Sequence, residues 1–350
     1  MRLAYTEDQQ LFRETVRDFL EGACTTDKLR EAWAADTAIT GRWTELAKIG
    51  VTGLVVPEEQ DGLGLTDEEF AAVLESAGYA ALPEPLLESA VAAGLLAEFA
   101  PDAGWLERIA SGEATAAVLL PGQPFAIEAA RADVLVVGTV NNGDNGVSEI
   151  HVLNPADCTL TAQRSVDRSR KLYKVEFEAA PETLVASGDA AAKALARAAD
   201  RGALGAAALL LGLTKRMLDM AVDYAKQRVQ RGVLIGTHQS VQHHLANVLI
   251  KLEFARPVVM RAAYSLARDL PSAARDVSMA KIYAGEAADL AARNALQVHG
   301  AIGYTEEHDL QLFMKRAWAL GAAWGDAGHH RDRVAADLLG GAPAPLTPTF

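Results

Sequence analysis

Residues 201–228 carry the pattern that most limits how this chain can fold. Their sequence, RGALGAAALLLGLTKRMLDMAVDYAKQR, places apolar side chains at helical spacing and contains no proline. The pattern predicts one long helix that is buried on most sides, as in the core of a helical bundle. A turn is expected in QRVQRGVLIG, which contains Gly232 and Gly236, and a second long helix over residues 237–270, with Thr237 as its N-cap. The two helices are predicted to run antiparallel.

The N-terminal part of the chain is also predicted to be helical. Residues 6–110 alternate helical patterns with short polar breaks. Both Thr6-x-x-Gln9 and Thr66-x-x-Glu69 have the spacing of a capping box, in which two side chains satisfy free backbone groups at a helix start. These features indicate an all-α unit.

The pattern changes near residue 114. The short apolar runs TAAVLL, FAIEAA, DVLVVGTV, EIHVL and KLYKVEF are separated by turn-rich pieces such as NNGDNG, which predicts strands at roughly residues 113–180. Helical patterns return from Asp189, and the tail GGAPAPLTPTF is rich in proline and glycine. The expected domains are an N-terminal helical domain (1–112), a shortened middle β-domain (113–182), a C-terminal helical bundle (183–340) and a flexible tail (341–350).

Composition excludes several classes of protein. The chain has 350 residues, 50% of them hydrophobic, and a mean hydropathy of +0.06, which is typical of globular proteins. Its net charge of -13 argues against a nucleic-acid surface, because phosphate binding needs a clustered basic face. The N-terminus lacks a signal-peptide pattern, and charges interrupt the alanine-rich segments, so no membrane span is expected. The expected location is the cytoplasm.

No metal site or disulfide is expected. Cys24 and Cys158 lie far apart and show no spacing typical of zinc ligands. His243 and His244 fall on adjacent faces of the second long helix, so at most one of them points into the core. Without cysteines or paired carboxylates at ligand spacing, they are interpreted as packing or surface residues.

Two separated motifs, together with a Gly-rich N-terminal segment, carry a resemblance to a known family. The N-terminal segment reads WTELAKIGVTGLVVPEEQDGLGLTDEEF. The first motif comprises Arg228, Gly232, Ile235, Gln239, His243, Leu245 and Ala246, and the second comprises Gln297, His299, Gly300, Ile302, Gly303, Tyr304, Thr305 and Glu306. Together they resemble the acyl-CoA dehydrogenases. The resemblance implies a mainly α fold with a small β domain between an N-terminal helical domain and a C-terminal four-helix bundle.

The resemblance also implies a reaction. It is the α,β-desaturation of an acyl-CoA thioester, in which a base removes the α-proton while the β-hydride goes to N5 of FAD. The implied partners are the acyl-CoA substrate and an electron-transfer flavoprotein or a similar acceptor.

Four residues match cofactor-binding positions of the family. The resemblance implies that Arg228 reaches the FAD pyrophosphate of a neighbouring subunit, a bidentate contact that suits a guanidinium. It implies that Gln239, Gln297 and Gly300 also serve this FAD, Gly300 by letting the bare backbone approach the cofactor. The alternatives are an arginine that only complements a helix dipole and a plain helix-capping glycine. Arg231 departs from the family, which usually has phenylalanine there.

The catalytic base is harder to place. Most family members carry a glutamate in a loop after the Gln-x-x-Gly corner, and the equivalent position here is Trp324, which cannot act as a base. A minority carry the base on the long helix directly before an arginine, and here that pair is Asp200-Arg201. Asp200 is therefore the candidate base, and the alternative is a solvated or salt-bridged acid at a helix start. Asp326 is a second candidate.

The middle domain lacks the family's flavin-ring motifs. Neither a Thr-Glu-Pro-like stretch nor a Gly-Ser-Asp stretch is present, and the corresponding region reads only LLPGQPFAIEAARADV. The chain thus has the residues that the family uses to contact a neighbour's FAD, but it lacks the motifs that hold the chain's own flavin ring. This asymmetry resembles the heteromeric (α2β2) acyl-CoA dehydrogenases of bacterial steroid catabolism, which accept bulky steroid-CoA thioesters.

Three functions are compatible with this resemblance. The first is a subunit of an FAD-dependent acyl-CoA dehydrogenase acting on a bulky, steroid-derived thioester. The second is a non-catalytic partner that completes the FAD site of an unlike dehydrogenase subunit. The third is an independent homo-oligomeric enzyme with Asp200 as its base. The first two functions differ in whether this chain supplies the catalytic base, and the missing loop glutamate is the feature that discriminates between them.

Overall fold

The computed structural model describes residues 6–34, 41–140 and 146–341. Their contacts form two compact units: a helical unit (residues 6–31, 71–82 and 203–341) and a mixed unit (residues 32–34, 41–70, 83–140 and 146–202). All but the first residue of the predicted tail, and most of the predicted NNGDNG turn, lie outside the described residues. The two units do not follow the three successive segments expected from the sequence.

The chain is mainly helical. The α-helices are α1 (Glu7–Ala23), α2 (Thr26–Ala34), α3 (Gly41–Lys48), α4 (Asp67–Tyr79), α5 (Leu86–Phe99), α6 (Trp105–Ala110), α7 (Gly188–Gln227), α8 (Gln239–Ala267), α9 (Ala273–His299), α10 (Leu310–Ala322) and α11 (Ala327–Leu339). Short 3-10 turns lie at Glu58–Gln60, Pro101–Ala103, Ala129–Arg131, Pro155–Asp157, Ile235–Thr237 and Gly300–Tyr304. Within the described residues, no helix is both long and apolar enough to cross a membrane.

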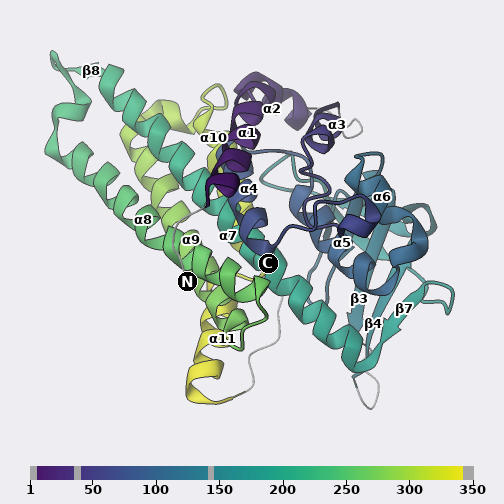
Figure 1. Ribbon diagram of the computed structural model, residues 1–350. Coiled ribbons are helices and arrows are strands. Elements are labelled where there is room, and N and C mark those ends of the chain that lie inside the picture. The colour runs from purple at the N-terminus through teal and green to yellow at the C-terminus, as the bar shows by residue number, and fades with distance from the viewer. Residues whose placement is uncertain (1–5, 35–40, 141–145, 342–350) are drawn as a thin grey trace. The chain divides into compact units, whose positions relative to one another are not determined.

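Both predicted long helices are present. Helix α7 is longer than predicted, because the alanine-rich residues 190–199 are good helix formers and extend the helix back to Gly188. Helix α8 begins after His238, so the predicted N-cap, Thr237, is wrong. The Thr237 hydroxyl instead donates to the carbonyl of Leu234 at 2.7 Å and closes the preceding turn. In Figure 1 the hairpin of strands β8 (Val229–Gln230) and β9 (Val233–Leu234) joins α7 to α8, and α9 runs back beside α8.

The capping predictions hold at the first helix and in part at the second. The N–H of Gln9 donates to the Thr6 hydroxyl, and the N–H of Thr6 donates to the Gln9 side chain, so the box at α1 is confirmed. At α4 the N–H of Thr66 donates to the Glu69 carboxylate at 3.0 Å. The Thr66 hydroxyl accepts from the N–H of Glu68 instead of Glu69.

The strands of the mixed unit form two small sheets. Strands β1 (Ala116–Leu119), β3 (Val134–Val140), β4 (Ser148–Leu153) and β7 (Leu184–Ser187) form one sheet, in the order β1-β3-β4-β7. Strands β2 (Ala126–Ile127), β6 (Leu172–Glu176) and β5 (Thr159–Gln163) form the other, in the order β2-β6-β5. Among the strands that the structure describes, β1 and β3 are the only pair that runs parallel. The last strand, β7, lies beyond the expected domain boundary at residue 182.

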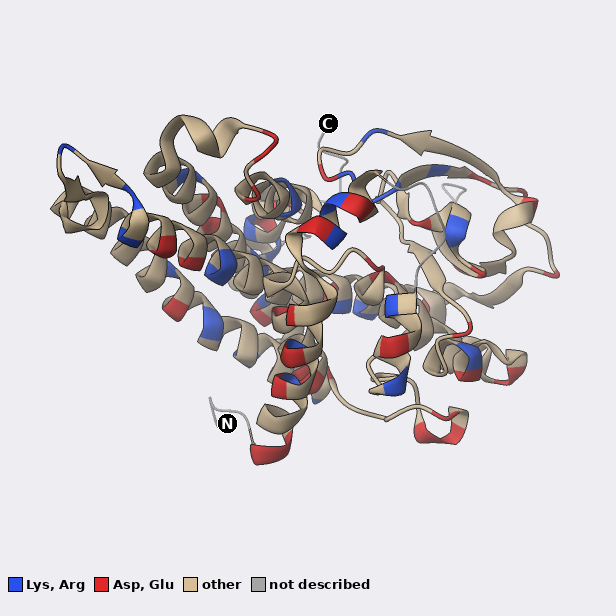
Figure 2. Cartoon of the chain, turned by 90° about the horizontal axis from the view of Figure 1, so that it is seen from above, with Lys and Arg blue, Asp and Glu red and all other residues tan. Residues whose placement is uncertain are grey.

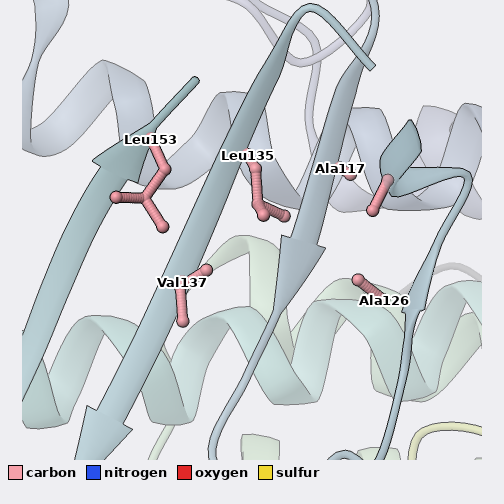
Figure 3. Close-up of a cluster of buried hydrophobic side chains, with 6 residues drawn as sticks. Ala117, Ala126, Leu135, Val137 and Leu153 are labelled. Carbon is pink, nitrogen blue, oxygen red and sulfur yellow. The ribbon is translucent and has the colours of Figure 1, made fainter. Parts of the chain in front are cut away.

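The core of the mixed unit is apolar. Figure 3 shows side chains from β1, β2, β3 and β4 that meet in one cluster, whose members include Ala117, Ala126, Leu135, Val137 and Leu153. Burial of such side chains is the main favourable contribution to folding. The outer strand β5 contributes little to this core, because most of its residues are exposed.

Candidate functional site

The four predicted cofactor-binding residues lie at helix ends of the helical unit. Arg228 directly follows α7, and Gln239 is the first residue of α8. Gln297 lies in the last turn of α9, and Gly300 caps that helix. All four residues are exposed.

Contacts between the helices bring these ends together. Tyr224, in the last turn of α7, stacks on His299 at the end of α9 with 4.5 Å between ring centroids. The side-chain amide of Asn294 on α9 donates to the carbonyl of His244 on α8 at 2.9 Å. The ends that carry the four predicted residues therefore belong to one end of the helical unit.

Arg228 has a fixed backbone and a free side chain. Its N–H donates to the carbonyl of Tyr224 at 2.8 Å, and its carbonyl accepts from the N–H of Ile235 at 2.9 Å. Among the described residues, no carboxylate forms an ion pair with its guanidinium. The exposed guanidinium is thus available for a phosphate from outside this unit.

Gly300 closes α9 and leaves open space beside it. Its N–H donates to the carbonyl of Leu296, so the plain capping role is real. Its φ of 65° and ψ of -141° suit glycine and disfavour other residues. A Cβ at this position would meet nothing within 4 Å. The backbone is therefore accessible to a ligand as well as being a helix cap.

His299 supports this corner from inside. Its side chain is buried, and Nδ1–H donates to the carbonyl of Ala295 at 2.7 Å. The ring also meets His308 edge-on, with 4.6 Å between centroids. Burial lowers the pKa of His299, which keeps the imidazole neutral at neutral pH. The supporting role of this side chain was missed from the sequence, because its partners are distant along the chain.

The predicted base, Asp200, belongs to the mixed unit. It lies about three turns into α7, and its exposed fraction is only 7%. Asp200 is therefore neither solvated nor at the start of α7, whereas the alternative of a salt-bridged acid stays open. The Arg201 guanidinium is held by Asp67, with Nε–Oδ1 at 2.7 Å and Nη2–Oδ2 at 3.3 Å.

Trp324 occupies a rigid turn in the helical unit. It is buried and has a φ of 59°, a conformation that is uncommon for residues other than glycine. Its carbonyl accepts from Nε2 of His330 at 3.0 Å, and the next carbonyl, of Gly325, accepts from Nζ of Lys281 at 2.9 Å. Burial, followed by the nearby Lys281 charge, lowers the pKa of His330 to about 3. Buried donors thus hold the backbone of this turn.

Asp326 has a structural task. It is the N-cap of α11, and its carboxylate accepts from the N–H of His329 at 2.8 Å. A carboxylate at this position stabilises the helix by satisfying a free N–H and by complementing the helix dipole.

The shortened region of the mixed unit holds a tight turn, a two-residue strand and a 3-10 turn. The N–H of Leu120 donates to the Gln123 side chain at 2.9 Å, and β2, which follows, has only two residues. Buried Glu128 accepts from the N–H of Lys171 at 3.0 Å and from Arg131 at 3.1 Å. Burial raises the pKa of Glu128, against the opposing effect of the Lys171 hydrogen bond. No sequence pattern marks this buried acid, because its partner Lys171 is distant along the chain.

Within the described ranges, no three His, Cys, Asp or Glu side chains gather as metal ligands. His243 is exposed and His244 is half-buried on α8.

The sequence matches two models of one family. The acyl-CoA dehydrogenase N-terminal domain matches residues 6–113, and the acyl-CoA dehydrogenase C-terminal domain matches residues 192–339. The acyl-CoA dehydrogenase IpdE2 of Mycobacterium tuberculosis is 30% identical over 314 residues, which cover 89% of this chain and 91% of IpdE2. The chain belongs to the acyl-CoA dehydrogenase family. It is thus a member of a family of oxidoreductases that act on acyl-CoA, as its motifs predicted.

Solved structures share the fold. A chain of the ChsE4-ChsE5 complex from Mycobacterium tuberculosis has a TM-score of 0.86 at 25% identity, covering 98% of this chain and 100% of that chain. A Tcur3481-Tcur3483 steroid ACAD variant has a TM-score of 0.83 at 23% identity, covering 95% of this chain and 98% of that chain. The predicted fold, mainly α with a small β domain between helical domains, is confirmed.

Proposed function

We propose that this chain is a subunit of an FAD-dependent acyl-CoA dehydrogenase that desaturates a bulky, steroid-derived acyl-CoA thioester together with an unlike subunit. The observation that carries the proposal is a contrast within the chain. The exposed Arg228, Gln239, Gln297 and Gly300 match the family's cofactor-binding motifs, whereas residues 119–134 hold only a tight turn, the two-residue strand β2 and a 3-10 turn, without the ring-holding motifs. The likeness to chains of the ChsE4-ChsE5 complex and of a steroid ACAD supports both the unlike subunit and the substrate class.

The residues at the end of the helical unit fit half of FAD. A guanidinium without an ion pair among the described residues suits a pyrophosphate, and the amide side chains of Gln239 and Gln297 can donate to phosphate, ribose or adenine. The open space beside Gly300 lets a planar or phosphate group approach the backbone. In this proposal these groups hold the adenosine and pyrophosphate of an FAD whose ring lies on the neighbouring chain.

Asp200 is the proton acceptor in this proposal. Its carboxylate would take the α-proton of the thioester, and the electron pair of that C–H bond would form the Cα–Cβ double bond as the β-hydride departs. FAD, when bound, supplies the hydride acceptor. Asp200 is almost fully buried, so little bulk water reaches its carboxylate. An electron-transfer flavoprotein or a similar acceptor is the proposed oxidant of the reduced enzyme.

A second function is favoured by one observation. Trp324 replaces the loop glutamate of most family members and lies in a turn fixed by His330 and Lys281. A chain of this kind could complete the FAD site of an unlike subunit that supplies the base itself.

The cofactor role is tested by Arg228→Ala in the enzyme purified with its unlike subunit. Loss of a charged phosphate contact weakens FAD binding by roughly 1.5 to 3 kcal/mol, which raises the Kd about 10- to 150-fold. Arg228→Lys should restore only part of the affinity, because an ammonium lacks the bidentate geometry. Arg17→Ala, which removes another exposed arginine from the helical unit, is the matched control. Unchanged flavin content in both Arg228 variants would rule out the role.

A further inference from the structure

The end of the helical unit that carries Arg228 is locally basic. The whole chain has a net charge of -13, yet residues 224–252 contain no Asp or Glu. Lys226, Arg228 and Arg231 all lie at or just before the hairpin of strands β8 (Val229–Gln230) and β9 (Val233–Leu234), and all three are exposed. Figure 2 shows this hairpin, at the left, with blue segments and no red. Such a basic island on an acidic chain attracts anions.

Arg231 lies in an unfavourable backbone conformation. It forms the two-residue turn of the hairpin with Gly232, and their φ angles are 51° and 81°. Turns of this type normally use Asn, Asp or Gly at both positions, because positive φ crowds other side chains. A long charged side chain at such a position makes Arg231 a candidate for a functional residue.

The side chain of Arg231 has no task within the described residues. It forms no ion pair or hydrogen bond there, in contrast to exposed Arg331, which binds Glu286 at 2.8 Å. The hairpin also exposes Val229, Val233 and Leu234, with exposed fractions of 53%, 44% and 40%. Exposed apolar side chains on both strands fit an element that is covered by another chain.

Arg228 and Arg231 can act on one ligand. The hairpin register pairs Val229 with Leu234 and Gln230 with Val233, so the two arginines flank strand β8. Three residues of extended chain span at most about 11 Å. Two arginine side chains can bridge that separation and meet on a single diphosphate, whose two charges match two guanidinium groups.

We propose that Arg231 is a second phosphate-binding residue, which together with Arg228 clamps the pyrophosphate of a dinucleotide held by the neighbouring chain. The inference rests on the proposed function, which assigns the pyrophosphate contact to Arg228 alone. A phenylalanine at this position would provide packing, whereas Arg231 lets the tip of the hairpin bind a charged group.

The first test measures the binding of inorganic pyrophosphate to the full chain by isothermal titration calorimetry. Arg231→Gly removes the guanidinium and relieves the positive φ, so the variant should fold at least as stably as the wild type. The wild type should bind pyrophosphate more tightly than orthophosphate, and Arg231→Gly should weaken pyrophosphate binding about tenfold. Arg17→Ala should match the wild type. Absence of pyrophosphate binding by the wild type, or equal binding by Arg231→Gly, would overturn the proposal.

The second test measures FAD affinity of the enzyme assembled with its unlike subunit. Arg231→Gly and Arg231→Phe should both raise the Kd for FAD about tenfold, whereas Arg231→Lys should raise it less. If Arg231→Phe binds FAD as tightly as the wild type, packing and not charge is the function, and the inference fails. If Arg228→Ala loses FAD while Arg231→Gly retains it, the inference fails and the proposed function stands. If both retain FAD, both fail.

Discussion

Asp200 separates the two proposed functions at the level of a single side chain. Asp200→Asn keeps the size of the side chain and removes the proton acceptor. If Asp200 is the base, turnover of the complete assembly should fall roughly 100-fold or more, while FAD binding and assembly persist. Steady-state kinetics with a matched flavin-content assay would measure this.

Asp67, which pairs with the adjacent Arg201, provides the control for Asp200. Asp67 holds Arg201 through two hydrogen bonds and has an exposed fraction of 1%. Asp67→Asn should therefore lower stability by leaving the half-buried Arg201 guanidinium poorly paired, as a purely structural change would. Normal turnover of Asp200→Asn would assign the base to the unlike subunit, and this chain would be the partner that lends Arg228 and Gln297.

His330 makes the stability of the chain depend on pH. Its pKa falls from 6.5 to about 3 in the folded state, so between these values the unfolded chain binds a proton that the folded chain does not. The free energy of unfolding should therefore decrease as pH falls, by about 2 kcal/mol between pH 6.5 and 5. Urea unfolding at both pH values measures it.

The variant His330→Gln isolates this residue from other histidines. Burial also lowers the pKa values of His299 and His308, which contribute in the same direction. His330→Gln should flatten the pH dependence, and the exposed His243→Gln should leave it unchanged. A slope for His330→Gln equal to that of the wild type would assign the acid sensitivity elsewhere.

Site residues differed in how far the sequence could predict them. Arg228 and Gln239 belong to a short contiguous motif, so their place beside a helix end followed from local pattern. The stack of Tyr224 on His299 and the buried Glu128 did not, because each depends on residues brought together by the fold. Burial of Asp200 was missed because the start of its helix was placed too late.

At the scale of elements, α4 and α7 approach each other through two glycines within the helical unit. A Cβ at Gly78 would lie 2.1 Å from the carbonyl oxygen of Leu209, and a Cβ at Gly212 would lie 2.0 Å from that of Glu75. Neither distance is possible for real atoms, and both obstacles are backbone. The two glycines therefore set the spacing of these helices.

A pair of glycine variants tests this packing. Gly212→Ala should lower the free energy of unfolding by about 3 kcal/mol, because α4 and α7 must separate. Gly285→Ala is the matched control, since a Cβ there meets nothing within 4 Å on α9. It should raise stability by roughly 0.5 to 1 kcal/mol through helix propensity alone. Thermal or urea unfolding with equal losses in both variants would contradict the packing argument.

The elements themselves were predictable where a pattern was strong. The runs DVLVVGTV and EIHVL became β3 and β4, because β-branched residues at the core favour strands. Strand β5, TLTAQ, was missed because most of its residues are exposed and polar, and its pairing with β6 is its only strand signal. The sequence therefore predicts the buried strands better than the edge strand.

At the scale of the molecule, the order of domains along the chain and the grouping in space differ. The helical unit takes residues 71–82 from the N-terminal part, and the mixed unit includes α7 up to residue 202. Helices α4 and α7 thus each contribute to both units. Sequence patterns indicate which segments are helices and strands, but a helix that continues from one unit into the other carries no local mark of the boundary.

Native mass spectrometry of the chain, alone and co-expressed with an unlike short acyl-CoA dehydrogenase chain, tests the central claim most directly. That claim is that this chain lends Arg228, Gln239, Gln297 and Gly300 to a flavin whose ring is held by another chain. Alone, the chain should carry little FAD, because the missing ring contacts are hydrogen bonds of roughly 1 kcal/mol each. With its partner it should form an α2β2 assembly that contains FAD. A yellow homo-oligomer with one FAD per chain, obtained from this chain alone, would contradict the account.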